Sequence, residues 1–199
     1  MVDELITLVW DVDDVLNPLM RSWFEKSWLR RHHGCDLAYG GISANPPHKL
    51  LGVTKREYLA SLDQFRLSDE YRKMKPVADV YSWFRRHGKN FRHIALTATP
   101  SETAAVSAGW VLEHFGMWIR SYNFVPSKRE GVQIPRYDRT KREYLSWLGK
   151  GDVLIDDSLA NLKEAKSIGM QTVLISQPWN GGRQTISESL ESLTLMFRS

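Results

Sequence analysis

Three aspartates directly follow the first apolar run of the chain. Asp11, Asp13 and Asp14 come after residues 6–10, whose sequence ITLVW is typical of a buried strand. Carboxylates packed against such a strand are costly unless a cation compensates their charge. Side chains alternate along a strand, so Asp11 and Asp13 should project to the same side. A hard cation such as Mg²⁺ is the natural partner of a carboxylate cluster.

A second acidic pair ends another strand-like run, far along the chain. Asp156 and Asp157 follow residues 153–155. The carboxyl ends of parallel strands form one edge of a sheet, and ligands bind at that edge. Chance is a poor explanation for two strands that both end in acidic residues. We therefore expect the two acidic strand ends, with Asp11, Asp13, Asp156 and Asp157, to lie together at one edge of a sheet.

A hydroxyl side chain ends the strand predicted at residues 93–96. Thr97 and Ala98 follow this run, and a helix is predicted to begin near Ser101. A strand end that leads into a helix offers a hydroxyl group and backbone N–H donors to an anion. Threonines at strand ends are also common turn or cap residues, so this feature alone is weak.

Two lysines are candidates for contact with an anion. Lys141 falls in the first turn of a predicted helix, where its charge opposes the helix dipole at a cost of a few tenths of a kcal/mol. That cost is understandable if the ammonium group reaches a bound phosphate. Two alternatives stay open: Lys141 is an exposed lysine beside Arg139 and Arg142, or Lys128, in the loop after the third predicted strand, makes the contact instead.

Apolar runs of strand length alternate with helical patterns along most of the chain. Strands are predicted at residues 6–10, 93–96, 122–125, 153–155 and 172–175, and helices at 77–87, 102–115, 140–148 and 159–168. This alternation predicts an α/β fold with a parallel sheet and helices on both faces. Continuous β-branched runs are typical of strands that are buried on both faces. Ser101 is the expected N-cap of the second helix, and Thr140 with Glu143 forms a capping-box pattern.

Residues 17–75 interrupt this alternation. Helices are predicted at 18–31, 54–63 and 68–73, and a loop rich in Gly, Asn and Pro separates the first two. Because this segment follows the first strand, it is expected to form a small helical cap at the carboxyl edge of the sheet. The predicted organisation is an α/β core domain of residues 1–16 and 76–199 with a cap of residues 17–75.

Composition and charge restrict the partners. The chain has 199 residues, a net charge of +4 and one cysteine, Cys35. Eleven Lys/Arg accompany six Asp/Glu between Arg21 and Lys75, which favours an anionic ligand or, alternatively, a solvated basic face. No apolar run could span a bilayer, the N-terminus lacks the basic segment of a signal peptide, and no internal disulfide can form. These features predict a cytoplasmic protein without a membrane partner.

The acidic and basic residues described above resemble a known set of motifs. Asp11-x-Asp13, Thr97, Lys141 and the Asp156-Asp157 pair follow one another in this order at the predicted strand ends and helix start. In this they are similar to the four motifs of the haloacid dehalogenase (HAD) superfamily. The resemblance implies a Rossmann-like sheet of order 5-4-1-2-3, whose central first strand would bring all four motifs together.

The resemblance also implies a role for each residue. Asp11 would be the nucleophile, and Asp13 would protonate the leaving oxygen and then activate water. Mg²⁺ would be held by the Asp11 carboxylate, the backbone carbonyl of Asp13, Asp156 and, directly or through water, Asp157. Thr97, Ala98 and Lys141 would bind the phosphoryl group of a small phosphorylated substrate.

One departure, the modest size of the helical insert and one short match indicate a subgroup. Asp14-Val15 replaces the Gly-Thr that many phosphatases of the superfamily carry, and Gln177-Pro178-Trp179-Asn180 follows the fifth predicted strand. These features are similar to the 5'(3')-deoxyribonucleotidase branch. In that branch, aromatic residues of the cap wall the base pocket. The candidates here are Trp23, Phe24 and Trp28. Residues with this spacing on an amphipathic helix are more often packing residues, so core packing is the favoured interpretation for them.

The resemblance therefore implies a Mg²⁺-dependent phosphomonoesterase with a nucleoside monophosphate as the favoured substrate. A phosphatase of a sugar phosphate or another small metabolite is the alternative within the same chemistry. A phosphoacceptor domain or a non-catalytic phosphate-binding protein is the alternative from another class. No nucleic-acid-binding motif is recognisable, so a nucleic-acid partner is not expected, and the oligomeric state stays open.

Overall fold

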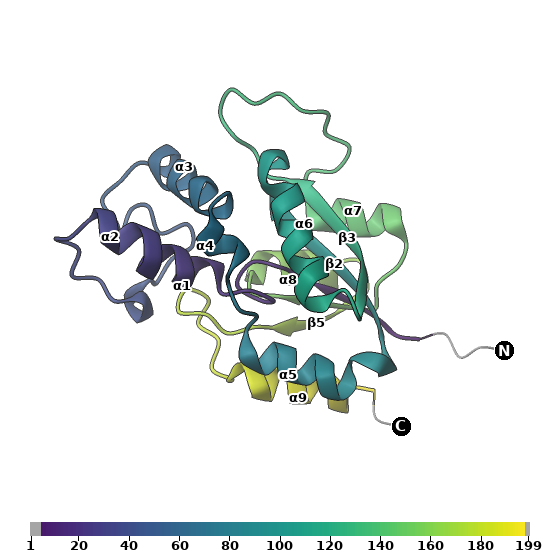
Figure 1. Ribbon diagram of the computed structural model, residues 1–199. Coiled ribbons are helices and arrows are strands. Elements are labelled where there is room, and N and C mark those ends of the chain that lie inside the picture. The colour runs from purple at the N-terminus through teal and green to yellow at the C-terminus, as the bar shows by residue number, and fades with distance from the viewer. Residues whose placement is uncertain (1–4, 198–199) are drawn as a thin grey trace.

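The computed structural model describes residues 5–197, and a five-stranded parallel sheet forms its centre (Figure 1). The strands are β1 (Thr7–Trp10), β2 (Arg92–Thr99), β3 (Ile119–Pro126), β4 (Val153–Asp156) and β5 (Gln171–Leu174). Their order is β3-β2-β1-β4-β5, which is the predicted order 5-4-1-2-3 read from the opposite edge. The predicted α/β class and strand order are confirmed, and β1 lies between β2 and β4.

Helices precede and follow the strands in the pattern expected of a parallel sheet. The α-helices are α1 (Leu19–Trp23), α2 (Leu29–Arg31), α3 (Lys55–Arg66), α4 (Asp69–Arg72), α5 (Ala78–His87), α6 (Ser101–Phe115), α7 (Lys141–Leu148), α8 (Leu159–Lys166) and α9 (Ile186–Leu195). A π-helical turn at Phe24–Trp28 joins α1 to α2, and short 3₁₀ turns occupy Tyr39–Gly41 and Gly88–Asn90. None of the helices in residues 5–197 combines the length and the hydrophobicity of a membrane span.

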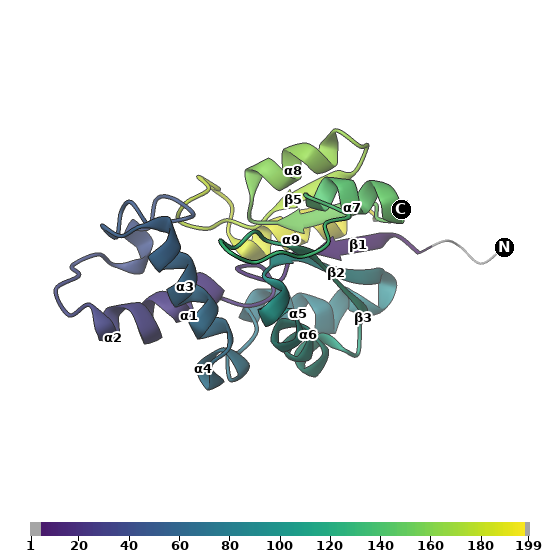
Figure 2. The same ribbon diagram turned by 90° about the horizontal axis from the view of Figure 1, so that it is seen from above.

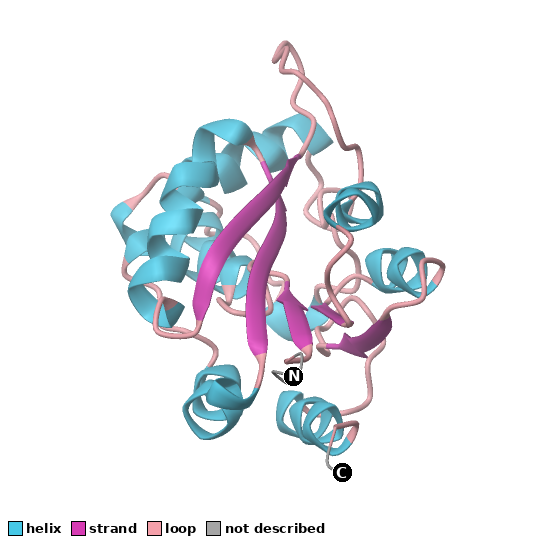
Figure 3. Ribbon diagram, turned by 90° about the vertical axis from the view of Figure 1, so that its right-hand side faces the viewer, coloured by secondary structure: helices cyan, strands magenta, loops and turns pink. Residues whose placement is uncertain are grey.

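Side chains of β1 alternate between two hydrophobic clusters. Leu8 and Trp10 belong to the larger cluster, which also contains side chains of α5, α6 and α9. Val9 belongs to a smaller cluster with side chains of α7 and α8. Figure 3 shows helices on both sides of the sheet, and every residue of β1 is buried. The edge strands β3 and β5 contain exposed positions, so the prediction of burial on both faces is wrong for the edges of the sheet.

The helical segment between β1 and α5 returns to the point where it leaves the sheet. The backbone N–H of Val77 donates to the carbonyl of Leu16 over 2.9 Å, so the two ends of residues 17–75 are adjacent. Figures 1 and 2 show α1 to α4 grouped on the side of the molecule toward which β1 runs. Trp23 of this segment belongs to the same cluster as Trp10. Apolar packing therefore holds the segment, hereafter the insert, beside the carboxyl edge of the sheet.

Capping explains where two of the predicted helices begin. Thr54 and Glu57 form a full capping box at the start of α3. At α7, Thr140 accepts a hydrogen bond from the amide of Glu143, but the Glu143 carboxylate accepts from the backbone of Arg139 rather than from Thr140. Only half of the predicted capping box is therefore present there.

Two helix starts differ from the prediction. Ser101 is the first residue of α6 and not its N-cap, because the extended Pro100 takes the N-cap position without a side-chain hydrogen bond. Helix α9 was not predicted, although Thr185 and Glu188 form a capping box at its start. The spacing Thr-x-x-Glu was the sequence signal for it.

His93, a buried histidine of β2, makes the stability of the fold depend on pH. Trp10 Nε1 donates to His93 Nδ1 over 3.0 Å, and His93 Nε2 contacts the carbonyl of Gly88 at 2.8 Å. This arrangement requires the neutral ring, since a proton on Nδ1 would face the indole N–H. Burial lowers the pKa of His93 to about 4, against the opposing effect of the Gly88 carbonyl.

We predict that His93 destabilises the fold as the pH falls. The unfolded chain protonates this side chain below about pH 6.5 and the folded chain only near pH 4, so stability is lost between these values. The loss attributable to His93 is about 2–3 kcal/mol at about pH 4.5. Urea unfolding of the wild type and of His93→Gln checks this, and the stability difference between them should shrink as the pH falls. A difference that does not depend on pH would contradict the assignment.

Candidate active site at the carboxyl edge of the sheet

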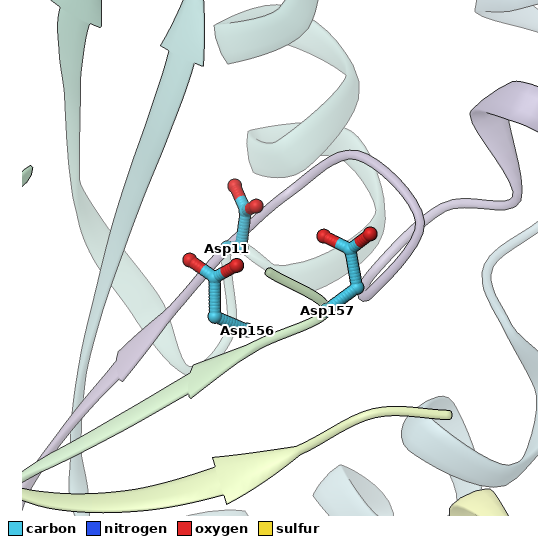
Figure 4. A group of neighbouring side chains, drawn as sticks. All are labelled: Asp11, Asp156 and Asp157. Carbon is cyan, nitrogen blue, oxygen red and sulfur yellow. The ribbon is translucent and has the colours of Figure 1, made fainter. Parts of the chain in front are cut away.

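Three carboxylates converge where β1 and β4 end. Asp11 follows β1, Asp156 is the last residue of β4, and Asp157 is next to it. One oxygen of each lies within 4.8 Å of an oxygen of the other two, and all three residues are buried. Figure 4 shows the three side chains directed toward a common space. The expected convergence of the two acidic strand ends is therefore present in the structure.

A buried lysine bridges two of these carboxylates. Lys141 Nζ lies 2.8 Å from Asp11 Oδ1 and 2.7 Å from Asp156 Oδ2, and only 3% of Lys141 is exposed. Lys141 is the first residue of α7, as predicted. The carboxylates explain why a cation occupies this unfavourable position on the helix dipole. Lys128, the other candidate, is exposed, and among the described residues Asp11 forms its ion pair with Lys141 instead.

The cluster carries more negative than positive charge. Asp11, Asp156 and Asp157 supply three carboxylates, and Lys141 supplies one ammonium group. Burial raises the pKa of Asp11 well above its usual value, and Asp156 and Asp157 add to this effect while Lys141 opposes it. Burial and Asp156 likewise raise the pKa of Asp157 to about 7. The pKa of Lys141 is raised, because the attraction of Asp11 and Asp156 exceeds the effect of its own burial.

Neighbouring amide and indole groups fix the orientation of Asp156 and Asp157. Asp156 accepts hydrogen bonds from the backbone of Ser158 at 2.7 Å and from Asn161 Nδ2 at 3.0 Å. Trp179 Nε1 donates to Asp157 Oδ2 over 2.8 Å. These donors were not identified as site residues from the sequence, although Asn161 lies one helical turn after the acidic pair and Trp179 lies in the segment noted after the fifth strand.

The loop after β1 has an unusual backbone. Asp14 has a φ of 61°, in the left-handed region that aspartate tolerates better than most residues. Its Oδ1 accepts a hydrogen bond from the amide of Met20 at 2.8 Å, and its carbonyl accepts one from Gln177 Nε2 at 2.7 Å. Burial and Asp157 raise the pKa of Asp14 well above its usual value. Asp14 therefore turns the chain away from β1 and adds another buried carboxyl group near Asp157.

The Asp13 side chain is not part of the carboxylate cluster. Asp13 Oδ2 accepts a hydrogen bond from Arg66 at 2.9 Å, and its Oδ1 accepts one from Asn17 Nδ2 at 3.2 Å. Arg66 belongs to α3 of the insert, and no sequence pattern identified it. Asp11 and Asp13 were expected to project to the same side of the strand. Both line one cavity, but only Asp11 belongs to the carboxylate cluster.

A cavity of about 390 Å³ separates the sheet edge from the insert. Asp11, Asp13, Thr97 and Ala98 are among the residues that line it on the sheet side. The insert contributes the following lining residues: Leu19, Met20, Asn45, Pro46, Lys55, Tyr58, Leu59, Leu62 and Arg66. Lys128 lines the same cavity. A ligand in this space would touch both parts of the chain.

The aromatic residues suggested for a base pocket lie elsewhere. Trp23 and Phe24 are fully buried, and Trp28 is 4% exposed. All three belong to the main hydrophobic cluster and none lines the cavity. The structure thus agrees with core packing rather than ligand contact. Tyr58 is the aromatic side chain of the insert that lines the cavity.

The donor set of the cluster fits a hard divalent cation. Its three carboxylates are oxygen donors, which Mg²⁺ prefers over nitrogen or sulfur. With one lysine present, two negative charges remain uncompensated, which matches the charge of one divalent ion. Burial, followed by the neighbouring carboxylates, raises the pKa of Asp11 and of Asp157. Asp11, Asp156 and Asp157 are therefore suited to hold Mg²⁺.

We predict that Lys141→Met destabilises the fold because it leaves buried carboxylates without their cation. At about pH 7.5 the loss should be about 3–5 kcal/mol, the usual effect of removing one partner of a buried ion pair. It should be smaller at about pH 5.5, where the carboxylates of the folded variant take up protons. Urea unfolding at both pH values checks this.

A matched control for this variant is available on α8. Lys163 is exposed, so Lys163→Met should change stability by no more than about 0.5 kcal/mol. A Lys141→Met protein as stable as this control would contradict the role of Lys141 as the charge partner of the cluster.

Comparison of the chain with known proteins identifies its fold. No protein-family model and no curated protein matches the sequence. Similar solved structures include a haloacid dehalogenase-like hydrolase from Streptococcus pneumoniae, which has a TM-score of 0.62 and 11% identity over 96% of this chain and 98% of that one. A proposed phosphoglycolate phosphatase from Lactobacillus delbrueckii subsp. bulgaricus has a TM-score of 0.59 and 15% identity, with 94% and 95% covered. A proposed HAD-hydrolase from Bacillus subtilis, crystallised with bound magnesium, has a TM-score of 0.55 and 15% identity, with 98% and 99% covered. The chain therefore has the fold of the haloacid dehalogenase-like hydrolases.

Proposed function

We propose that this protein is a Mg²⁺-dependent phosphomonoesterase that acts through an aspartyl-phosphate at Asp11. The observation that carries the proposal is the buried cluster of Asp11, Asp156 and Asp157 with Lys141 at the carboxyl edge of the sheet. A carboxylate that attacks a phosphate needs nearby positive charge, which a lysine and a divalent ion supply together. The similar solved structures, whose names include hydrolases and a phosphatase, support the same chemistry.

The residues of the site have distinct tasks in this mechanism. Asp11 Oδ1 accepts hydrogen bonds from the amide of Val12 and from Lys141, so these donors orient the attacking carboxylate. Asp11 attacks phosphorus while the bond from phosphorus to the leaving oxygen breaks. Asp13 gives its proton to that oxygen. Thr97 lies at the cavity wall, where its hydroxyl can donate to a phosphoryl oxygen.

The second half of the reaction regenerates the enzyme. Asp13, now a carboxylate, takes a proton from water as this water attacks phosphorus, and the bond to Asp11 breaks to release phosphate. The Asp11, Asp156 and Asp157 carboxylates and the backbone carbonyl of Asp13 would hold Mg²⁺. When bound, this ion neutralises charge on the phosphoryl group and lowers the repulsion between it and Asp11.

A small phosphorylated metabolite, such as a sugar phosphate or phosphorylated acid, is the substrate class that we favour. One of the similar structures is described as a proposed phosphoglycolate phosphatase, and none of those compared above is named as a nucleotidase. The aromatic residues that were candidates for a base pocket, Trp23, Phe24 and Trp28, are buried in the core. The cavity instead presents Lys55 and Arg66 from the insert, which suit an anionic substrate.

We predict that Asp11→Asn abolishes phosphate release from p-nitrophenyl phosphate, because an amide cannot act as the nucleophile. The replacement is nearly isosteric, so the urea-unfolding midpoint should stay close to that of the wild type or rise. Colorimetric release of p-nitrophenol with Mg²⁺ measures the reaction. Full activity in a folded Asp11→Asn protein would contradict the proposed nucleophile. A wild-type protein that becomes phosphorylated but never releases phosphate would indicate a phosphoacceptor domain instead.

We predict that sugar phosphates and phosphorylated carboxylic acids have higher kcat/KM values than deoxynucleoside monophosphates. The physical reason is that the insert lines the cavity with the cationic side chains of Lys55 and Arg66, and with Tyr58 as its one aromatic side chain among the described residues. A panel of phosphomonoesters assayed for inorganic phosphate, with and without EDTA, checks this prediction. Faster turnover of deoxynucleotides would restore the nucleotidase interpretation.

A further inference from the structure

One residue of the insert reaches across the cavity to a residue of the sheet edge. Arg66, at the end of α3, places its Nη2 group 2.9 Å from Asp13 Oδ2. Only 6% of Arg66 is exposed. Charge-assisted hydrogen bonds with this geometry are among the stronger contacts in proteins. The insert is therefore directly connected to the side chain that we propose as the general acid and base.

The same arginine is part of a longer series of alternating charges. Its Nη1 group lies 2.8 Å from Asp63 Oδ1, on the preceding turn of α3. Asp63 is also contacted by Arg129, from the segment after β3, through both Nε and Nη2, the latter at 2.9 Å. The order Arg129–Asp63–Arg66–Asp13 thus begins and ends on the α/β part of the chain and passes through the insert. Two arginines balance two aspartates within it.

Burial makes these contacts costly to separate. Removing one partner of a buried ion pair leaves an uncompensated charge, which destabilises a protein strongly. If α3 moved away from the sheet edge, the ion pair between Arg66 and Asp13 would break, and Asp13 would lose its charged partner. The position of the insert and the orientation of the Asp13 carboxylate are therefore coupled.

The contacts of Asp13 leave it able to react. Arg66 occupies Oδ2, whereas Oδ1 accepts only the 3.2 Å hydrogen bond from Asn17 among the described residues. A carboxylate oxygen has room for a second hydrogen bond. Arg66 also lines the cavity, and its buried Nε has no hydrogen-bond partner among the described residues. The pair thus lines the space that a substrate would occupy, and Asp13 Oδ1 can accept a further hydrogen bond.

We infer that Arg66 is a positioning residue, which orients Asp13 for proton transfer when the insert covers the cavity. This inference rests on the proposed phosphomonoesterase function. Asn17 fixes one oxygen of Asp13 from the loop after β1, and Arg66 fixes the other from the insert. The insert then contributes to the chemical step as well as to the enclosure of the substrate.

The test compares esters that differ in how much they need a proton on the leaving oxygen. We suggest p-nitrophenyl, p-chlorophenyl and unsubstituted phenyl phosphate, which share a shape but leave as increasingly basic phenolates. The parameter is kcat/KM, which reports the steps up to the first bond cleavage. Wild-type values should vary little, because Asp13 protonates the leaving oxygen. Arg66→Met should lower kcat/KM for phenyl phosphate by about 10²-fold and for p-nitrophenyl phosphate by less than about tenfold.

Further variants separate positioning from a merely structural role. The double variant Asp13→Asn with Arg66→Met should be no slower on phenyl phosphate than Asp13→Asn alone, because both substitutions impair the same proton transfer to the leaving oxygen. Arg66→Lys keeps the charge, should give intermediate rates, and provides the test if Arg66→Met does not fold. Arg72→Met removes an exposed arginine of α4 as the matched control and should retain the wild-type dependence on the leaving group.

The outcomes distinguish this inference from the proposed function. Equal losses for all three esters, or losses that multiply in the double variant, would overturn the positioning role of Arg66 while leaving the phosphatase function intact. A wild-type protein that hydrolyses none of the esters with Mg²⁺ would instead contradict the proposed function itself.

Discussion

The structure depends on an excess of buried negative charge at the carboxyl edge of its sheet. Three aspartates from two strand ends meet there, and one buried lysine compensates only part of their charge. Such a cluster is unfavourable in a folded protein unless a cation or a proton joins it. Much of the surrounding structure supplies donors to these carboxylates, including Ser158, Asn161 and Trp179. The same charge that makes the site costly makes it suited to bind a divalent ion.

The fold provides this arrangement with few elements. Neighbouring parallel strands β1 and β4 end side by side, so residues that are far apart in sequence meet without a long loop. Helix α7 begins near the same edge and brings Lys141 to the carboxylates. The insert closes the other side of the cavity through apolar packing and through the Arg66–Asp13 ion pair. The ends of β1 and β4 therefore supply carboxylates, α7 supplies a cation, and the insert covers the cavity.

Periodicity and chemistry in the sequence were sufficient to predict the sheet and the centre of the site. The five apolar runs correspond to the five strands, and the acidic residues after residues 10 and 155 converge as expected. This worked because a buried parallel strand requires a continuous apolar run, and a strand end fixes where the next side chain lies. Helix α9 was missed although Thr185 and Glu188 carried a signal for it.

Other parts of the site could not be predicted from a short sequence pattern. Arg66 is one of several arginines on polar helices, and only tertiary packing places it beside Asp13. The left-handed backbone of Asp14 is held by hydrogen bonds from Met20 and Gln177. Met20 is near Asp14 in the sequence and Gln177 is far from it, so no local pattern combines them. Trp23, Phe24 and Trp28 illustrate the opposite problem, since their spacing fitted both packing and ligand contact until their burial was known. The division of the chain into core and cap domains remains a prediction.

We propose that Asp11, Asp156 and Asp157 together hold one divalent cation. A crystal structure of the protein soaked in Mn²⁺, with the ion located by its anomalous scattering, would show this site most directly. We expect a single strong peak between the three side chains, about 2.0–2.3 Å from carboxylate oxygens of Asp11 and Asp156. A fully occupied ion bound elsewhere, with no peak between these carboxylates, would contradict it.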